Sequence, residues 1–222
     1  MDRWNRLLVV GVSVAVMLVG AGCGVLVDSG PKSEAPQTEP ESAALTTAAP
    51  VLETVSMLDD FNGAFTWLPE KDWGDAAKVT RVARDAEKKD QAMDIQYTLA
   101  AKKKVVVGRD FVDPRDLSGF NAVMLDVDSK LPVGCFVAVG LSTTPGRKYV
   151  EGPPVHVAPG RNKDLVIRLD EPRFKSAASE WAYTQPVGDL KAVQKILILL
   201  YPIPDGRIQV DNLRLAKFRA GK

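Results

Sequence analysis

The chain has 222 residues, of which 26% are charged and 45% hydrophobic, and its formal net charge is +1. This composition excludes a wholly disordered chain, and the presence of a single long apolar run excludes a polytopic membrane protein. The small net charge gives no support for nucleic-acid binding. One histidine and two cysteines exclude a disulfide framework and a zinc site rich in His or Cys.

Residues 1–22 have the features of a secretory signal peptide. Arg3 and Arg6 lie in a short polar start, residues 7–22 form the apolar run LLVVGVSVAVMLVGAG, and small residues precede Cys23. The run is short for a membrane span, which needs about 20 residues. We therefore expect this segment to be cut off rather than retained as an anchor.

The sequence around Cys23 sharpens this prediction. Gly20-Ala21-Gly22-Cys23 resembles the lipobox of bacterial lipoproteins, in which the cysteine receives diacylglycerol, although Gly20 stands where that family prefers Leu. The resemblance implies lipidation of Cys23 and stable membrane anchoring. Gly24, in place of Asp, implies the outer membrane by the same resemblance, so we expect an extracytoplasmic protein anchored at the outer membrane or cell surface. The alternative is an ordinary signal peptide or an uncleaved anchor, with Cys23 incidental.

Residues 23–53 are expected to form a disordered tether that starts at the lipidated cysteine. From Val25 onward the segment is rich in Pro, Ser, Thr, Ala and Glu and has no aromatic residue. It cannot bury enough apolar surface to offset the entropy of ordering. Repulsion among its carboxylates and its scattered prolines favour an extended spacer that holds a folded domain away from a bilayer.

Residues 54–222 are enough for one domain, and its sequence alternates repeatedly between apolar and polar residues. This alternation predicts strands with one buried face. The predicted strands are 55–61, 93–99, 123–127, 135–141, 165–169, 195–201 and 207–218. Of these, Lys195–Tyr201 is apolar on both sides and should be central and covered on both faces.

Only 116–119 and 186–194 look helical, and Pro and Gly separate the strands. Many strands in one domain of this size predict an all-β fold, an antiparallel β-sandwich or jelly roll with one or two short helices.

The last predicted strand changes phase. Ile208 and Val210 share one parity, whereas Leu213 and Leu215 share the other, so the apolar side flips across Asp211-Asn212. A single extra residue in a strand has this effect, and we predict a β-bulge there. The alternative is that Asn212 begins a turn.

The sequence offers little for catalysis. His156 has no neighbouring Ser or Asp pattern, and Cys135 lies in an apolar strand where a thiol packs as a small hydrophobe. There is no Gly-Lys-Ser/Thr phosphate loop and no GxGxxG motif. The carboxylate pairs Asp59-Asp60 and Asp126 with Asp128 keep a sugar-active hydrolase as an alternative, but nothing places them across a cleft. We expect a protein without catalytic activity.

Four short motifs follow one another in a characteristic order: LDDF at 58–61, DLSGFNA at 116–122, YVEG at 149–152 and VDNLRL at 210–215. Together they resemble the galactose-binding-like β-jelly rolls, which include many carbohydrate-binding modules attached to glycoside hydrolases. The resemblance covers nearly all of residues 58–215. It implies the fold more strongly than the ligand, because one fold hosts many functions.

The resemblance implies a structural calcium ion near the first and last strands, held by Asp59 or Asp60 with Asp211, whose oxygens are hard ligands. No other cofactor is expected. Independently, Asp59 shares parity with Val55 and Phe61, so its carboxylate points to the apolar side and needs a cation, a donor or a raised pKa. The alternative is that Asp59 or Asp60 accepts backbone N–H bonds at a turn.

The resemblance also implies sugar binding by exposed aromatic rings, which stack on the C–H face of a pyranose, with polar side chains for its hydroxyls. The candidates lie in stretches rich in Pro, Gly and charge, and they are Trp67, Trp73, Trp181 and Tyr183, with Arg147, Tyr149 and Glu151 between strands. The alternative is that the tryptophans close the ends of the sandwich and are buried.

These observations predict a non-catalytic glycan-binding domain on a membrane-anchored envelope protein. Its partners would be a glycan and, through the lipid, a membrane, but no nucleic acid. One alternative is an envelope lipoprotein that binds a partner protein through an exposed patch. The other is a glycoside hydrolase.

Overall fold

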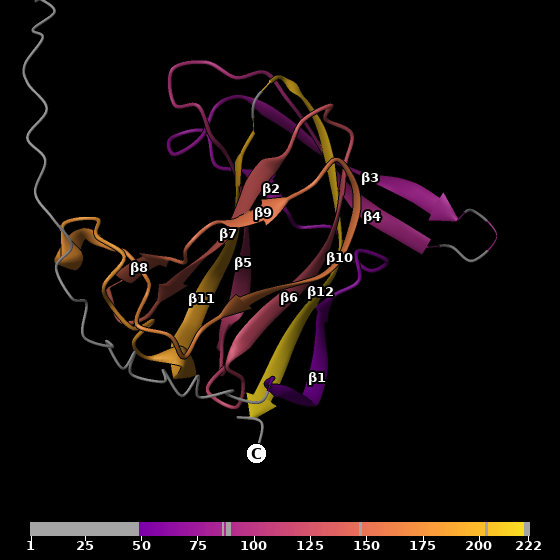
Figure 1. Ribbon diagram of the computed structural model, residues 1–222. Coiled ribbons are helices and arrows are strands. Elements are labelled where there is room, and N and C mark those ends of the chain that lie inside the picture. Colours follow the sequence, from indigo (N-terminus) through magenta and orange to yellow (C-terminus); the bar gives the residue numbers. More distant parts are fainter. Residues whose placement is uncertain (1–48, 86, 88–89, 147, 203, 220–222) are drawn as a thin grey trace, which may run out of the picture. The chain divides into compact units, whose positions relative to one another are not determined.

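The computed structural model describes residues 49–219 except 86, 88–89, 147 and 203 (Figure 1). Its strands form two six-stranded sheets, and every strand pair is antiparallel. Sheet A contains β1 (Val51–Asp59), β3 (Ala77–Asp85), β4 (Asp90–Tyr97), β6 (Ala122–Ser129), β10 (Gly160–Arg168) and β12 (Gly206–Arg219). Sheet B contains β2 (Leu68–Pro69), β5 (Val105–Arg115), β7 (Cys135–Thr143), β8 (Lys148–Glu151), β9 (Val155–Val157) and β11 (Val193–Tyr201).

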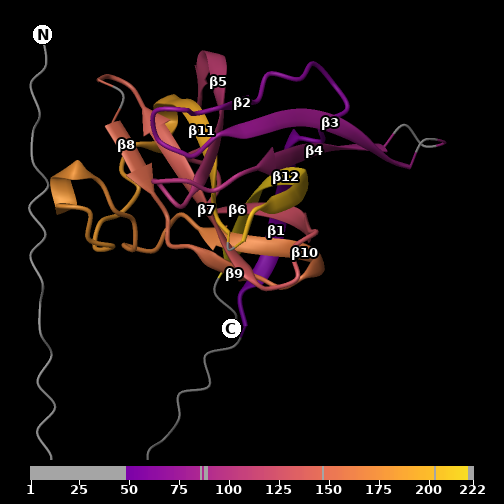
Figure 2. The same ribbon diagram turned by 90° about the horizontal axis from the view of Figure 1, so that it is seen from above.

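The two sheets are stacked as layers, which Figure 2 shows from above. Sheet A has the order β10-β6-β12-β4-β3, with β1 paired to β12, and sheet B has the order β2-β5-β11-β7-β8, with β9 paired to β7. The predicted all-β, antiparallel sandwich is confirmed. In the part of the chain that the structure covers, no helix has the length and apolar character needed to cross a membrane.

The core fills the space between the sheets with alternate residues of each strand, as the period-two pattern requires. Met93 and Ile95 of β4 in sheet A and Ile196 and Ile198 of β11 in sheet B belong to this core, and all four are fully buried. The prediction that 195–201 is central and covered on both sides is confirmed, because β11 lies between β5 and β7 and its opposite face is also buried, at Leu197 and Leu199.

The predicted bulge is confirmed. The pairing of β12 with β6 slips between Asp211 and Arg214, and Asn212 has a positive φ of 49°. Because of this extra residue, Leu213 and Leu215 turn to the same buried side as the earlier apolar residues of β12.

The helix predictions were partly wrong. The described residues contain two 3₁₀ turns, η1 (Ala177–Ser179) and η2 (Leu190–Ala192), and only η2 overlaps the predicted segment 186–194. Residues 116–119 form no helix, since the side chain of Asp116 accepts the backbone N–H and the hydroxyl of Ser118, which stabilises a turn. Strand β1 begins at Val51, three residues before Thr54, because its pairing with β12 starts at Val51 and Arg219.

Candidate functional site

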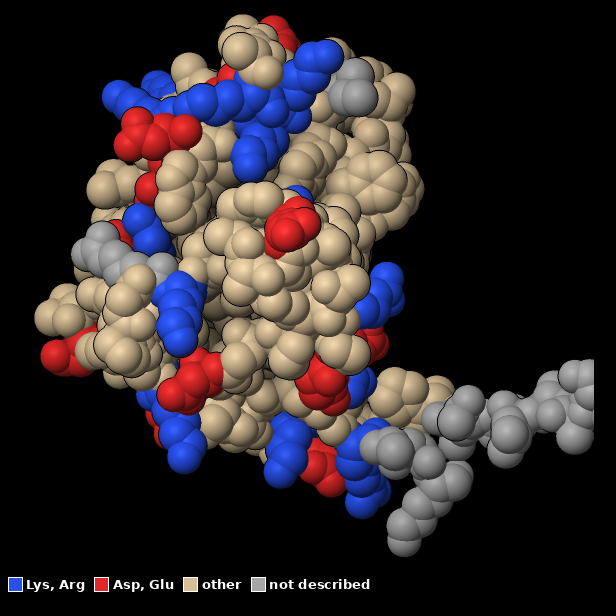
Figure 3. Space-filling model, turned by 90° about the vertical axis from the view of Figure 1, so that its left-hand side faces the viewer, with Lys and Arg blue, Asp and Glu red and all other residues tan. Residues whose placement is uncertain are grey.

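The outer face of sheet B, which points away from the core, carries the candidate site. Along β7, Val137 and Val139 point into the core, so Ala138 and Gly140 lie on the outer face. Val106 of β5 and Leu197 and Leu199 of β11 also lie on this face and are buried, which means that other side chains cover them. Figure 3 views the molecule from this side and shows a broad, mostly uncharged area with one acidic patch inside it and with Lys and Arg along its upper edge.

Three aromatic rings lie in a row on this face. The ring centroids of Trp73 and Tyr149 are 4.9 Å apart in an edge-to-face arrangement, and those of Tyr149 and Trp181 are 6.2 Å apart. Trp73 is 41% exposed and Trp181 is 55% exposed. We call Trp73, Tyr149 and Trp181 the aromatic platform. Its rings are partly open to solvent although each packs against a neighbour.

A buried carboxylate lies beside the platform and organises it. Glu151 is only 1% exposed. Its oxygens accept hydrogen bonds from the hydroxyls of Tyr149 (2.9 Å), Tyr183 (3.3 Å) and Tyr201, and the Nζ atom of Lys175 lies 2.7 Å away. Lys175 also sits 4.8 Å from the centre of the Tyr183 ring. This network fixes the direction of each tyrosine ring.

The electrostatics keep the network in one protonation state. Burial opposes ionisation of Glu151, but Lys175 and the hydroxyls of Tyr201 and Tyr149 outweigh it, and the pKa of Glu151 falls below its usual value. Burial and the charge of Glu151 raise the pKa values of Tyr149 and Tyr201. At neutral pH the carboxylate is therefore ionised and the phenols remain donors.

Gly140 allows the central ring to lie on the sheet. It pairs with Glu151 in the register of β7 and β8. A Cβ atom on Gly140 would lie 2.8 Å from Cε2 of Tyr149 and 3.3 Å from a methyl carbon of Leu199. The missing side chain leaves the space that the Tyr149 ring occupies.

A tight turn after β2 places Trp73. The carbonyl of Glu70 accepts the backbone N–H groups of Trp73 (3.1 Å) and Gly74 (2.9 Å), and the N–H of Glu70 donates to the carbonyl of Val106 (2.8 Å). A Cβ atom on Gly74 would lie 2.6 Å from the backbone nitrogen of Val106. Glycine thus lets the turn lie directly against β5, with Trp73 beside the platform.

A loop anchored at both ends places Trp181. Phe174 is fully buried and pairs with Gln185, and Lys175 pairs through its backbone with Glu151 of β8. Trp181 has a φ of 65°, in the left-handed region that residues with a side chain rarely adopt, and its N–H donates to the carbonyl of Ser176 (2.9 Å). Such a conformation persists only where its surroundings hold it, and it often occurs at functional sites.

A groove of about 630 Å³ adjoins the platform. Tyr149 and Trp181 form part of its wall, and Lys148, Ser176 and Gln185 contribute polar groups. The hydroxyl of Ser176 donates to Oε1 of Gln185 (2.8 Å). The groove therefore combines aromatic surface with hydrogen-bonding groups.

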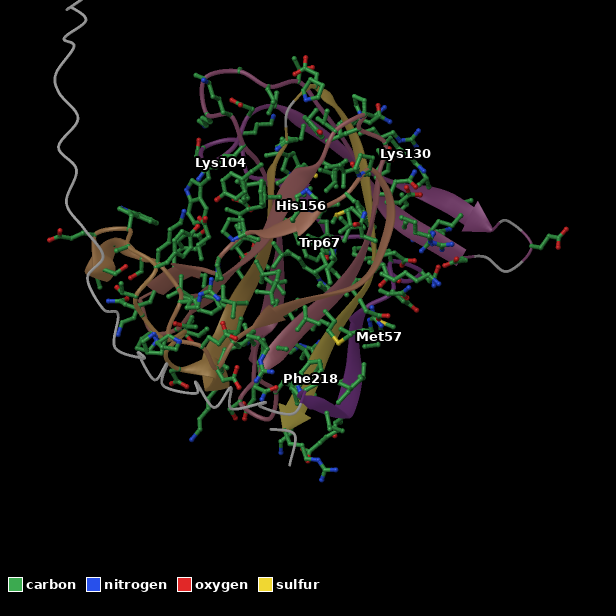
Figure 4. All side chains as sticks on the ribbon, viewed as in Figure 1. Met57, Trp67, Lys104, Lys130, His156 and Phe218 are labelled. Atoms are coloured by element: carbon green, nitrogen blue, oxygen red, sulfur yellow. The ribbon has the colours of Figure 1, made fainter. Side chains whose placement is uncertain are left out.

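The structure brings five predicted residues together on one face, namely Trp73, Tyr149, Glu151, Trp181 and Tyr183. It also corrects one prediction. Trp67 is only 1% exposed and lies between the sheets (Figure 4), where its indole Nε1 donates to Asp59 (2.8 Å). A buried indole N–H needs such an acceptor. Arg147 and Cys23 lie outside the described residues.

The calcium prediction does not fit the structure. The carboxylate of Asp59 accepts hydrogen bonds from Trp67 and from the backbone N–H of Phe61 (2.8 Å), and it is paired with Arg109 at 2.5 Å. Asp60 accepts the backbone N–H of Asn62 (3.0 Å). A guanidinium already supplies the positive charge that a calcium ion would bring, so this donor set does not suit the metal.

Asp211 is also engaged elsewhere. It forms an ion pair with Arg84 and accepts the N–H of Asn212 (2.7 Å). Burial raises its pKa, and Arg84 and Asn212 oppose that rise. Within the residues that the structure covers, no three His, Cys, Asp or Glu side chains gather in a way that could hold a metal ion. Asp59 and Asp60 instead follow the alternative, in which a turn carboxylate accepts backbone N–H groups.

Asp126 and Asp128 are held in ion pairs, and Cys135 is buried. Asp126 pairs with Arg214 (2.8 Å), and Asp128 pairs with Lys130 (2.6 Å) on the outer side of sheet A. The thiol of Cys135 is buried, and this burial raises its pKa, which disfavours a nucleophilic thiolate.

Sequence reasoning missed two members of the site. Tyr201 shares parity with Leu197 and Leu199 on the outer face of β11, so the alternation could have identified it. Lys175 belongs to an irregular segment, and only its backbone pairing with Glu151 brings it to the site.

No protein-family model and no curated protein matches the chain. Several solved structures share its fold. A family 11 carbohydrate-binding module of the cellulosomal cellulase Lic26A-Cel5E of Clostridium thermocellum is 20% identical with a TM-score of 0.52, over 73% of this chain and 94% of that one. A family 11 module from the same organism, in complex with a β-1,3-1,4-mixed-linked tetrasaccharide, is 18% identical with a TM-score of 0.53, over 73% and 95%.

An agarase, AgWH50C, is 13% identical with a TM-score of 0.53, but the match covers 77% of this chain and only 25% of the agarase. At these identities the similarity concerns the fold. It agrees with the jelly roll that the sequence motifs implied.

Proposed function

We propose that the chain is a non-catalytic glycan-binding protein and that the sugar rings of the bound glycan stack on the aromatic platform. The observation that carries this proposal is the row of three contacting, partly exposed rings held beside a buried carboxylate. A pyranose presents a C–H face that packs on an aromatic ring, while its hydroxyls need hydrogen-bonding partners. The groove beside Trp181 supplies such partners.

The rigidity of the platform supports this function. Stacking on one ring is weak, so a sugar site gains affinity when its rings are ordered before the ligand arrives. Tyr149 is held by its hydrogen bond to Glu151 and by its position on Gly140, and Trp181 is held by its loop. Little conformational entropy remains to be lost on binding.

The structural comparisons give independent support. Modules of this fold include one that was solved with a mixed-linked tetrasaccharide bound. The carboxylates named as a hydrolytic pair, Asp126 and Asp128, are held in ion pairs with Arg214 and Lys130, which favours binding over hydrolysis.

A glycan array probed with the full-length chain tests this proposal. Wild type should bind a defined subset of glycans, and Trp181→Ala should lower the affinity about tenfold or more. Val112→Ala is the matched control, because Val112 is fully exposed on β5 and outside the platform. Three results would each overturn the proposal. They are absence of glycan binding, an equal loss of glycan affinity in both variants, and release of reducing sugar by wild type.

We also propose that Cys23 is lipidated and that residues 23–53 tether the domain to a membrane at the cell surface or outer membrane. This rests on the sequence alone, namely the charged start, the short apolar run and the small residues before Cys23. Mass spectrometry of the mature N-terminus tests it. A diacylated Cys23 as first residue supports the proposal, and an unmodified residue upstream of Cys23 refutes it.

A further inference from the structure

A group of lysines lies at one edge of the outer face of sheet B. Lys71 belongs to the turn after β2, and Lys102, Lys103 and Lys104 come directly before β5. The Nζ atom of Lys102 donates to the carbonyl of Lys71, which joins the two segments. We call these four residues the lysine edge.

The charge of the lysine edge is not neutralised by ion pairs. Across the described ranges, the lysines that pair with carboxylates are Lys130, Lys175 and Lys195, and none of them belongs to the edge. Three acidic residues are close in sequence, Glu70, Asp72 and Asp75. Glu70 is already paired with Lys195, so four lysines against Asp72 and Asp75 leave a local charge of +2. The carboxylate of Asp75 is engaged by the backbone N–H groups of Ala100 (2.9 Å) and Lys102 (3.0 Å).

Lys104 of the lysine edge lies on the same side of the sheet as the aromatic platform. Val105 points into the core and Val106 points outward, so Lys104 has the outward parity of β5. The carbonyl of Lys104 accepts the N–H of Asp75 (2.7 Å), two residues after Trp73. Figure 4 shows Lys104 on the sheet B side, and Figure 3 shows cationic side chains along the upper edge of the mostly uncharged area.

We propose that the glycan that binds the platform is anionic, a polysaccharide whose sugars carry uronate or sulfate groups. The inference rests on the proposed function and adds the chemical class of the ligand. Stacked sugars on Trp73 would bring their charged substituents toward Lys104 and its neighbours. An ammonium group attracts such groups as a point charge, without the planar geometry that arginine imposes.

A nucleic acid is another polyanion with stackable rings, but the observations favour a glycan. The chain carries a net charge of only +1, whereas binding to a phosphate backbone draws on many cations. The groove beside Trp181 also offers hydroxyl, amide and ammonium groups, which suit sugar hydroxyls.

Affinity measurements with charged and neutral forms of the same polymer test the inference. The full-length chain is titrated with polygalacturonate and with its fully methyl-esterified form, and with a sulfated galactan and its desulfated form. One charged member should bind about tenfold more tightly than its neutral counterpart at low salt, since each exposed ion pair contributes up to about 1 kcal/mol. Which pair shows the effect distinguishes uronate from sulfate, and added salt should reduce it.

The variant Lys103→Gln/Lys104→Gln should remove this preference and leave the affinity for the neutral form unchanged. Lys78→Gln/Lys217→Gln is the matched control, because it removes the same charge from exposed residues of β3 and β12 in sheet A. Thermal unfolding of each variant verifies that it is folded.

The outcomes separate this inference from the proposed function. Equal affinity for the charged and neutral forms, with binding still weakened in Trp181→Ala, overturns the anionic ligand and leaves glycan binding intact. Tighter binding to single-stranded nucleic acid than to any glycan overturns the inference as well. Absence of binding to every glycan overturns both proposals.

Discussion

Replacing Glu151 with Gln should destabilise the protein and weaken glycan binding together. The carboxylate is 2% exposed at its side chain and pairs with Lys175, which is 18% exposed, at 2.7 Å. Breaking a buried ion pair by neutralising one partner costs about 3–5 kcal/mol. Lys175 recovers part of its hydration and the Gln carbonyl still accepts a hydrogen bond, so we expect a loss of about 2–4 kcal/mol.

Urea unfolding of wild type and Glu151→Gln measures this cost. Asp128→Asn is the matched control, because the Asp128–Lys130 pair is more exposed, at 26% and 46%, and surface pairs contribute about 0–1 kcal/mol. The Gln variant should also bind glycan less tightly, since Tyr149 loses the acceptor that orients it. A loss of stability no larger than that of the control, with unchanged glycan affinity, would refute the role of Glu151.

The remaining predictions concern pH, packing and metal. Folding lowers the pKa of Glu151 from 4.5, so its contribution to stability is present above about pH 4.5 and is lost as the pH falls through the folded-state pKa. The difference in unfolding free energy between wild type and Glu151→Gln should therefore shrink in acid. A constant difference from pH 7 to pH 3 would contradict this. Gly140→Ala should displace the Tyr149 ring, lowering stability by about 1–3 kcal/mol together with glycan affinity, and unaltered affinity by calorimetry would count against the platform. Trp67→Phe removes the hydrogen bond to Asp59 and should cost about 1–2 kcal/mol without changing glycan affinity, which urea unfolding and calorimetry together measure. EDTA should leave the melting temperature unchanged, whereas a lower melting temperature in EDTA would show that a structural metal ion is bound after all.

The sequence predicted strands where one face is buried and the other exposed. It missed the short strands β2, β8 and β9 and the longer strands β3 and β5. For β3 and β5 the reasons differ. In β5, Val105, Val106 and Val107 are all buried because the turn that carries Trp73 covers the outer side, so no alternation is visible. Strand β3 lies at the end of the order in sheet A, where neither face is fully covered and the pattern is weak.

The aromatic rings of the site were predictable from the sequence, but the hydrogen-bond network around Glu151 was not. Trp73 and Trp181 are exposed, as their polar sequence surroundings predicted, but Trp67 has similar surroundings and is buried. The burial of Trp67 depends on Asp59, which is eight residues away, and on Arg109, which shares that carboxylate from a distant strand. Such partners are set by the tertiary fold, which local composition does not contain.

The network around Glu151 shows the same limit. Its partners Tyr183 and Tyr201 are 32 and 50 residues away in the chain. The YVEG motif placed Tyr149 and Glu151 near each other, but only the pairing of β7, β8 and the loop with Lys175 brings the other donors to the carboxylate.

A titration that follows tryptophan fluorescence tests the platform most directly. The glycan that binds best on the array is added to wild type and to the variant Trp73→Phe/Trp181→Phe, in which Trp67 still reports from the core. Stacking on the platform predicts a saturable change in wild-type emission that disappears in the variant, with weaker binding measured by calorimetry. A change of the same size in the variant, or saturable binding that leaves wild-type emission unaltered, would contradict the account.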